Sequence, residues 1–552
     1  MTDHSNSAQG VGRREFLKAM AVVSAGTAAG AFTSCTAGDG GADQGGSVDV
    51  TLKTGGWPYG PMPPAKDQKE NPATKAYADV LRAWLDQNPG VKLEAIEFDV
   101  WDQQALTTAV TGGTAPAFYP GNVLGGWNNA ATKSAFVQGL AADVTALIEE
   151  YRFADKMADY VRPIWDSWQL DGAYYAAPQG FGAGNGVYYR RDLVREEGLA
   201  EPQPGWTWDD LATLAVGLTE GQRKGIALQA FGLEWWLNTE GWSLLTRVPA
   251  PATSWNWTYD YTSRADVWID IVGKYRTLAF DDGAVLSDVS FADPDVTAAF
   301  SQGRVAMMPN NQFFMLGDPN TADTPGNLAK KLGKPINDVV GWIQHPVGTH
   351  GNIGNTQPFL TVLSFSPDLD EDALDKAMSL HDYMTFGDGY VDQKKAAYDA
   401  TKDLQKVYTD PTPLRKDAEI EGVPGTLADA WGEQYAEAVR AAAAIPLLPA
   451  PDQYLPVEAN QGPNETAEQD AQSRWMYERG DLDVRADLQK VEQTRNQQAE
   501  SFTSSVSDEE FVAGAKEYFA ALDAFWAEHA PEFSSQVFRP WYEQTVVPAL
   551  AG

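Results

Sequence analysis

The amino-acid sequence predicts an α/β protein that folds into two or more lobes. Strand-like and helical segments alternate from residue 48 onward, which is the pattern of α/β domains. The chain has 552 residues, of which 43% are hydrophobic and 11% aromatic, so it can bury more than one large core. Beyond the N-terminal leader, no apolar run approaches the roughly 20 residues that a membrane span needs.

The first folded elements can be placed in order along the chain. Residues 48–53 alternate apolar and polar side chains, as in a half-buried strand. Residues 72–87 carry apolar side chains at helical spacing and end before an Asn-Pro-Gly stop. A second strand is predicted at 91–98, and a second helix at 102–110. Loops that follow such strands are where α/β folds place ligands.

Two later helix starts are marked by capping and acidic residues. Thr207 has the form of an N-cap, with two aspartates in the turn that follows. Asp368, Asp370 and Asp372 alternate as in a calcium loop, but an Ala-Leu helical pattern follows them. This continuation favours a charged helix N-terminus over a calcium site.

Residues 1–35 are predicted to be a Tat-type lipoprotein signal. Arg13 and Arg14 precede an apolar run of about thirteen residues, too short to span a bilayer. Cys35 closes this segment behind two small residues, which resembles a lipobox, where the cysteine becomes acylated. The alternative is a plain secretory leader with an incidental cysteine. Residues 36–47 are rich in Gly, Ala and Asp and predict a flexible tether.

Charge and cysteine content exclude several classes of protein. The formal net charge is −35 and no basic stripe interrupts it, so nucleic acid is excluded as a partner. With a single cysteine there is no disulfide within the chain and no thiolate metal site. The five histidines are scattered, and no nucleophile elbow, zinc-protease motif or Walker loop is present. We therefore predict no metal and no cofactor.

Three stretches carry a family resemblance. The first runs from DGAYYAAP at residues 171–178, through GVYYRRDL at 186–193, to TWDDL at 207–211. The second is FSQGRVAMM at 300–308, and the third is a strand and helix at 358–386. In this order they resemble the family 1 extracellular solute-binding proteins, the maltose-binding-like receptors of ABC importers. The resemblance spans roughly residues 48–388.

The resemblance implies a two-lobed, periplasmic-binding-protein-like fold of type II, whose hinge the chain crosses three times, near Pro178, Gly303 and Gln357. An N-terminal lobe of residues 48–180 and 303–356 is expected. A C-terminal lobe of residues 181–302 and 357–552 would include a helical C-terminal extension. The extension either packs on the C-terminal lobe or is an appendage without contact to the ligand.

Ligand would lie in the cleft beside these crossings. Aromatic rings can stack on the apolar faces of sugars, and amides can bind sugar hydroxyls. Tryptophans at helical or capping positions, such as Trp84, Trp208, Trp268 and Trp526, are instead expected in the cores. The candidate ligand-binding residues are Trp57, Tyr59, Trp101, Asn122, Trp127, Gln179, Trp235, Trp236, Trp242, Asn310, Asn311, Gln312, Asn355 and Gln357. The segment Trp255-Asn256-Trp257 fits either the core or the cleft.

We expect a monomeric, lipid-anchored receptor that captures a carbohydrate and delivers it to the permease subunits of an ABC importer. The expected carbohydrate is an oligosaccharide. Two alternatives stay open: a secreted glycan-active enzyme, which needs two carboxylates flanking the scissile bond, and a receptor of the same fold for a non-sugar solute. The acidic net charge disfavours uronic acids as ligands. Local arginines such as Arg190, Arg191 or Arg247 can override that field.

Overall fold

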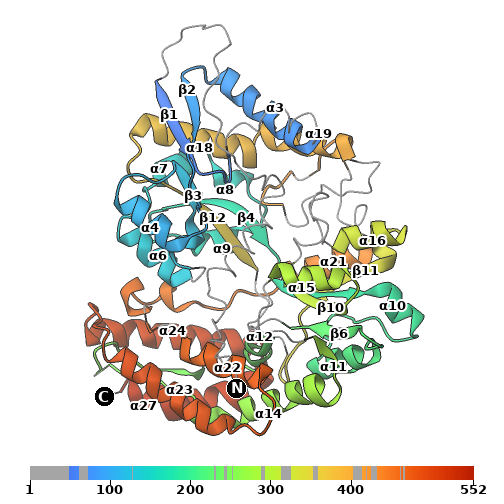
Figure 1. The fold of residues 1–552 in the computed structure, drawn as a ribbon. Helices are drawn as coiled ribbons and strands as arrows, with labels where there is room; N and C mark the ends of the chain where they lie inside the picture. The colour runs from blue at the N-terminus through green and yellow to red at the C-terminus, as the bar shows by residue number, and fades with distance from the viewer. Residues whose placement is uncertain are drawn as a thin grey trace, which may run out of the picture.

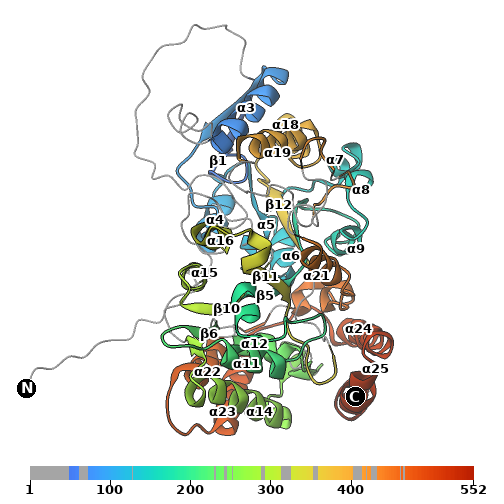
Figure 2. The ribbon, with the colours of Figure 1, turned by 90° about the vertical axis from the view of Figure 1, so that its right-hand side faces the viewer.

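The computed structural model shows an α/β molecule with two lobes and a helical C-terminal region beside the second lobe (Figures 1 and 2). The predicted export signal, with Arg13, Arg14 and Cys35, and the predicted tether lie outside the described residues. The structure describes residues 49–60, 72–126, 129–228, 232–241, 245–251, 253–286, 293–311, 325–351, 358–401, 413–417, 419–423, 432–460, 462–463 and 466–551.

Two small sheets form the centre of the first lobe. The parallel pair β1 (Val50–Thr54) and β2 (Val91–Ala95) confirms the two strands predicted at the start of the fold. The other sheet has the order β3 (Phe118–Pro120), β12 (Phe359–Phe365), β4 (Ala177–Gly182), and both of its pairings are antiparallel. The middle strand of this sheet therefore comes from far along the chain.

Helices surround the sheets of the first lobe, and α18 and α19 lie beside β1 and α3 (Figure 1). The helices α3 and α4 confirm the two predicted near residues 72–87 and 102–110. The helices are α3 (Pro72–Gln87), α4 (Gln103–Thr111), α5 (Gly121–Leu124), α6 (Asn129–Val137), α7 (Thr145–Glu150), α8 (Phe153–Lys156), α9 (Arg162–Asp166), α18 (Glu371–Thr385) and α19 (Asp388–Thr401).

The second lobe is centred on a five-stranded sheet. Its strands, in the spatial order β11-β5-β10-β6-β9, are Val340–Gln344, Asn185–Arg190, Val305–Asn311, Lys224–Ala227 and Val285–Leu286. A separate antiparallel hairpin pairs β7 (Arg247–Pro249) with β8 (Trp257–Tyr259). The helices of this lobe are α10 (Arg191–Glu196), α11 (Trp208–Gly217), α12 (Gly232–Asn238), α14 (Ala265–Arg276), α15 (Asp293–Ser301), α16 (Pro325–Leu332) and α17 (Ile336–Val339).

Capping residues begin several helices where the sequence predicted. Thr207 forms a capping box with Asp210 at the start of α11. Asp102 accepts two backbone hydrogen bonds at the start of α4. Asp370 accepts the backbone N–H of Ala373 at 2.8 Å and caps α18. The aspartates around Asp370 thus form the charged helix N-terminus that the sequence favoured.

The predicted assignment of segments to lobes is wrong in one respect. The segment 303–356 was expected in the first lobe, but its strands β10 and β11 both pair with β5 in the sheet of the second lobe. Conversely, β12 pairs with β3 and β4 in the first lobe. Gly303 therefore lies within the second lobe, at a φ of +76° between α15 and β10. The chain instead passes between the lobes after β4, between β11 and β12, and between residues 423 and 433.

The C-terminal extension packs on the second lobe and shares its core. Trp475 of α22 contacts Trp268 of α14 with ring centroids 5.1 Å apart, and Phe511 of α24 meets Trp257 edge-on at 5.0 Å. These aromatic contacts join the extension to the core of the second lobe. The helices of the extension are α21 (Glu433–Ala443), α22 (Thr466–Tyr477), α23 (Val484–Ala499), α24 (Asp508–His529), α25 (Pro531–Phe533), α26 (Arg539–Trp541) and α27 (Val547–Ala549).

Tryptophans expected in the cores are buried there. Trp84 lies in the core of the first lobe, and Trp208, Trp268 and Trp526 lie in the core that the second lobe shares with the extension. Within the part of the chain that the structure describes, no helix is long and apolar enough to cross a membrane.

Candidate ligand-binding site

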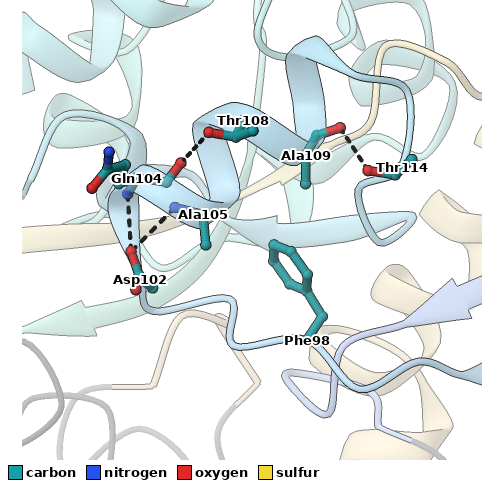
Figure 3. A pocket seen from close by; sticks show the side chains of 7 residues that line it. All are labelled: Phe98, Asp102, Gln104, Ala105, Thr108, Ala109 and Thr114. Carbon is teal, nitrogen blue, oxygen red and sulfur yellow. Dashed lines mark hydrogen bonds between the residues drawn. The ribbon is translucent and has the colours of Figure 1, made fainter.

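A recess lined by α4 and the segments that flank it in the first lobe has a volume of about 490 Å³ (Figure 3). Its polar side chains are committed to the helix itself. The Asp102 carboxylate accepts the N–H groups of Gln104 and Ala105, and the hydroxyls of Thr108 and Thr114 donate to backbone carbonyls. Few groups are left to recognise a ligand, so we do not place the site here.

A second pocket, of about 300 Å³, lies where the second lobe meets the C-terminal extension. This volume is at the lower end of the roughly 300–1,000 Å³ that small-molecule sites occupy. The second lobe lines it with Glu234, Leu237, Asn238, Thr246, Arg247, Trp257, Tyr259 and Tyr261, and the extension with Pro451, Glu468, Gln469, Gln472, Arg495, Tyr518 and Phe519. Aromatic rings, amides, carboxylates and guanidinium groups therefore meet in one pocket, which we name the extension pocket.

The β7–β8 hairpin places an arginine against the aromatic wall of this pocket. Because side chains alternate along a strand, Trp257 and Tyr259 share one face of β8. Arg247 of β7 pairs directly with Tyr259 across the hairpin, and its guanidinium carbon lies 4.2 Å from the centre of the Trp257 ring. A cation over an indole face is favourable and orients the guanidinium plane.

Helix α23 of the extension supplies a second arginine, Arg495, which is almost fully buried. Its guanidinium donates to Glu468 at 3.0 Å and to the hydroxyls of Tyr261 and Tyr259 at 2.8 and 2.9 Å. The Tyr261 hydroxyl in turn donates to Glu468 at 2.6 Å. Burial, together with the Glu468 charge, raises the pKa of Tyr261 well above its usual value, so it stays a neutral donor. This network neutralises the Arg495 charge within the protein.

In the first lobe, Trp57 and Trp101, two of the predicted residues, pack together with ring centroids 4.9 Å apart. Trp57 is buried and Trp101 is partly exposed. Both residues lie in the loops that follow β1 and β2.

Tyr59 and Gln179 meet in a buried network around His381 of α18. The Tyr59 hydroxyl lies 2.8 Å from His381 Nδ1, 3.0 Å from the Thr385 hydroxyl and 3.4 Å from Gln179 Oε1. His381 Nε2 lies 3.1 Å from the Pro178 carbonyl oxygen, so Nε2 carries the proton and Nδ1 accepts from Tyr59. Burial lowers the pKa of His381 to about 3 and keeps the ring neutral. The network fixes the loop after β1 to the start of β4.

Several predicted contacts are occupied by structural interactions. The Asn122 amide bonds the backbone of Leu360 and Val362 in β12. Trp236 is buried and stacks on Trp208 at 4.7 Å. We therefore leave Asn122 and Trp236 out of the proposed site, because neither side chain offers its binding groups to a ligand.

Asn310 and Asn311 lie buried at the end of β10. The backbone carbonyl of Asn310 accepts the indole N–H of Trp342 at 3.0 Å. The backbone carbonyl of Asn311 accepts a hydrogen bond from the Tyr188 hydroxyl at 2.7 Å. Trp235 is half-buried and lies 4.8 Å from His345, ring centre to ring centre. Five predicted residues lie outside the described part of the chain: Trp127, Trp242, Gln312, Asn355 and Gln357.

The extension pocket adds residues that the sequence did not single out as ligand contacts. The alternating Trp257-Thr258-Tyr259-Asp260-Tyr261 was the available signal, because alternation is typical of a strand with its rings on one face, although β8 itself ends at Tyr259. No sequence signal pairs this face with Glu468 and Arg495. That contact joins positions more than two hundred residues apart.

The fold is that of the two-lobed solute-binding proteins. The sequence model of the bacterial extracellular solute-binding proteins matches residues 65–386, over half of the chain, and the chain belongs to this family. No curated protein matches the chain.

Solved structures share the fold at low identity. The GacH receptor of Streptomyces glaucescens GLA.O is 15% identical, with a TM-score of 0.53 over 82% of this chain and 99% of that one. The substrate-binding protein Lmo0181 of Listeria monocytogenes, in complex with cycloalternan, is 17% identical, with a TM-score of 0.52 over 81% of this chain and 99% of that one. The maltose/maltodextrin-binding domain MalE of Bdellovibrio bacteriovorus, bound to maltotriose, is 13% identical, with a TM-score of 0.51 over 81% of this chain and 99% of that one. The likeness covers nearly the whole of each of these chains and shows a common fold.

Proposed function

We propose that this protein is a lipid-anchored receptor that captures an oligosaccharide outside the cytoplasm and delivers it to an ABC importer. Its family supports the extracellular and solute-binding parts of the proposal. Relatives of the same fold are described with acarbose, cycloalternan and maltotriose, which supports a carbohydrate as the solute. Acylation of Cys35 would keep the receptor close to its permease.

The extension pocket is the single observation that carries this proposal. It is lined by the aromatic residues Trp257 and Tyr259, and by the polar side chains of Asn238 and Glu234 from the second lobe and Gln469 from the extension. Sugars present both kinds of surface, apolar ring faces and hydroxyl edges. Trp57, Trp101, Gln179 and Trp235 remain proposed ligand contacts outside this pocket.

Thermal unfolding of the mature protein with a panel of neutral and acidic mono- and oligosaccharides tests the function. A ligand at 100 times its Kd should stabilise the folded protein by about 2.7 kcal/mol and raise its unfolding temperature. The same assay is run with amino acids and peptides, and stabilisation by one of these and by no sugar would contradict the carbohydrate proposal.

Asn238→Ala tests whether the extension pocket is the site. Asn238 is partly exposed and lines the pocket, so losing its amide should weaken the sugar found in that screen by roughly 3- to 10-fold in Kd, measured by calorimetry. Gln493→Ala, at an exposed position of α23 that does not line the pocket, is the matched control and should bind normally. Equal affinities for both variants would place the ligand elsewhere.

The proposed receptor carries out no reaction. Glu234 and Glu468 both line the extension pocket, so a glycoside hydrolase is the alternative to test. Glu468 is held by Arg495 and by the Tyr261 hydroxyl, an arrangement that favours an ionised, structural carboxylate. Incubation with the bound oligosaccharide should leave it intact, and its cleavage by catalytic amounts of protein would refute the receptor.

A further inference from the structure

Arg247 differs from the other charged groups of the extension pocket in having no acidic partner. Arg495 is paired with Glu468, and the nearby Asp452 is paired with Lys133. Among the described residues, no carboxylate lies within ion-pair distance of Arg247. The one hydrogen bond that its guanidinium makes to a described residue goes to the neutral Asn460 amide, with Nη2 3.2 Å from Oδ1.

The two other arginines that the sequence analysis named are satisfied by the protein. Arg190 makes a bidentate pair with Asp192, with both N···O distances 2.7 Å. Arg191 is 3.0 Å from Glu201 and also donates to the Asn337 carbonyl. Among the described residues, Arg247 is therefore the one of the three that lines a pocket without an ion-pair partner.

The environment of Arg247 penalises its charge. Burial lowers the pKa of this guanidinium, and the positive charge of Arg495 acts in the same direction, while the more distant Asp452 carboxylate acts in the opposite direction. The Trp257 ring lies 4.2 Å and the Trp255 ring 5.9 Å from the guanidinium carbon, and Arg247 also lines the pocket. A guanidinium has five N–H donors, so most of its donors remain for a ligand.

The geometry points to Arg247 as the group that binds a carboxylate of the ligand, so that the solute is an acidic carbohydrate such as a uronic-acid oligosaccharide. The planar fork of an arginine matches a carboxylate with two parallel hydrogen bonds. Glu234, on the same pocket wall, lies beyond ion-pair distance of Arg247 and is suited to accept hydroxyl hydrogens from the same sugar. The inference rests on the proposed carbohydrate function and names its substrate class.

The strong negative charge of the whole chain does not oppose this inference. Exposed charges farther away than about 8 Å are largely screened at physiological ionic strength. A guanidinium inside a partly closed pocket acts over a few ångströms through a medium of low polarity. The contact at the pocket therefore decides whether an acidic group binds.

The experiment compares acidic sugars with neutral counterparts of the same shape. Dimers and trimers of glucuronate, galacturonate, mannuronate and guluronate, and their methyl esters, are titrated into the mature protein by calorimetry. We expect at least one free acid to bind at least 10-fold more tightly than its ester. Arg247→Met should weaken the acid by roughly 10- to 100-fold and leave the ester nearly unchanged. Arg247→Lys, which keeps the charge, should recover part of the loss.

Arg539→Met is the matched control. It removes the same charge from an arginine that is about half exposed and paired with Asp523, and it should bind the acid normally. Circular dichroism of each variant monitors folding, and the salt dependence of acid binding to the unchanged protein gives a readout that needs no variant. Binding of neutral sugars only, or equal binding of acid and ester, would overturn the inference and leave the receptor standing. Binding of no sugar at all would overturn both.

Discussion

His345 has a buried imidazole next to a predicted ligand-stacking residue, Trp235. Neither of its ring nitrogens has a hydrogen-bond partner among the described residues, and burial lowers its pKa to about 3. His381, in the other lobe, is equally buried with a pKa of about 3, but its two nitrogens are used by Tyr59 and the Pro178 carbonyl. His381 therefore stabilises the first lobe through its hydrogen bonds, whereas His345 is expected to lower the stability of the second lobe.

His345→Phe should stabilise the protein and reduce its sensitivity to acid. The folded pKa of about 3 lies below the usual 6.5, so between these values the unfolded chain binds the proton and stability falls as the pH falls. From pH 6.5 to 4.5 this histidine accounts for a loss of about 2–3 kcal/mol, which the variant should not show. Urea unfolding at both pH values measures it. A wild-type pH slope in the variant would show that His345 is not held neutral.

At the scale of elements, α23 of the extension holds the β7–β8 hairpin, which alone is too small to be stable. Asn496 imitates a neighbouring strand: its Oδ1 accepts the Tyr259 N–H at 2.8 Å, and its Nδ2 donates to the Tyr259 carbonyl at 2.9 Å. Glu492 accepts the backbone N–H groups of Tyr261 and Thr262. The aromatic wall of the extension pocket thus depends on a helix outside the family match.

Asn496→Ala should destabilise the protein by about 2–4 kcal/mol, because it leaves partly buried backbone groups of Tyr259 unpaired. Hydrogen exchange at residues 257–261 should accelerate, and sugar affinity should fall with it. Gln497→Ala, the next and exposed position on α23, serves as the control and should change stability by less than about 0.5 kcal/mol. Unchanged exchange in the hairpin would show that α23 does not hold it.

At the scale of the whole molecule, the segment after α21 joins the extension to both lobes. Lys133 of α6, in the first lobe, forms an ion pair with Asp452 in which both side chains are only 4% exposed, and it also donates to the Ser167 carbonyl. A few residues later, the Ala459 carbonyl accepts the Trp257 indole N–H at 2.8 Å. Contacts to the first lobe and to the extension pocket are thus only seven positions apart in the chain.

Asp452→Asn should destabilise the protein by about 3–5 kcal/mol, because it leaves Lys133 buried without an opposite charge. Asp382→Asn breaks the Lys156 pair within the first lobe, whose lysine is about one-third exposed, and should cost less. Replacing both partners, as Lys133→Met with Asp452→Leu, should recover much of the loss. Chemical unfolding compares the variants, and equal losses for the two single variants would contradict a buried link between the lobes.

Much of the local structure could be predicted from residue patterns. The helix at 72–87, the Thr207 cap and the positive φ of Gly303 follow from interactions within a few residues. The lobe that contains Gly303 could not be predicted in this way. It depends on whether residues 305–311 pair with β5 or with β3, and the apolar pattern of that strand fits either sheet.

The sequence by itself determined the class of fold, the family resemblance and the predicted export signal, because each depends on motifs that are short or keep their order along the chain. Only the tertiary structure decided which segments form each lobe, and which of three arginines lacks an acid. Arg190 and Arg191 find acidic partners within about ten residues, but the surroundings of Arg247 include Asn460 and Arg495, which lie far along the chain. Long-range packing sets the charge balance of a pocket, and that balance does not appear in composition.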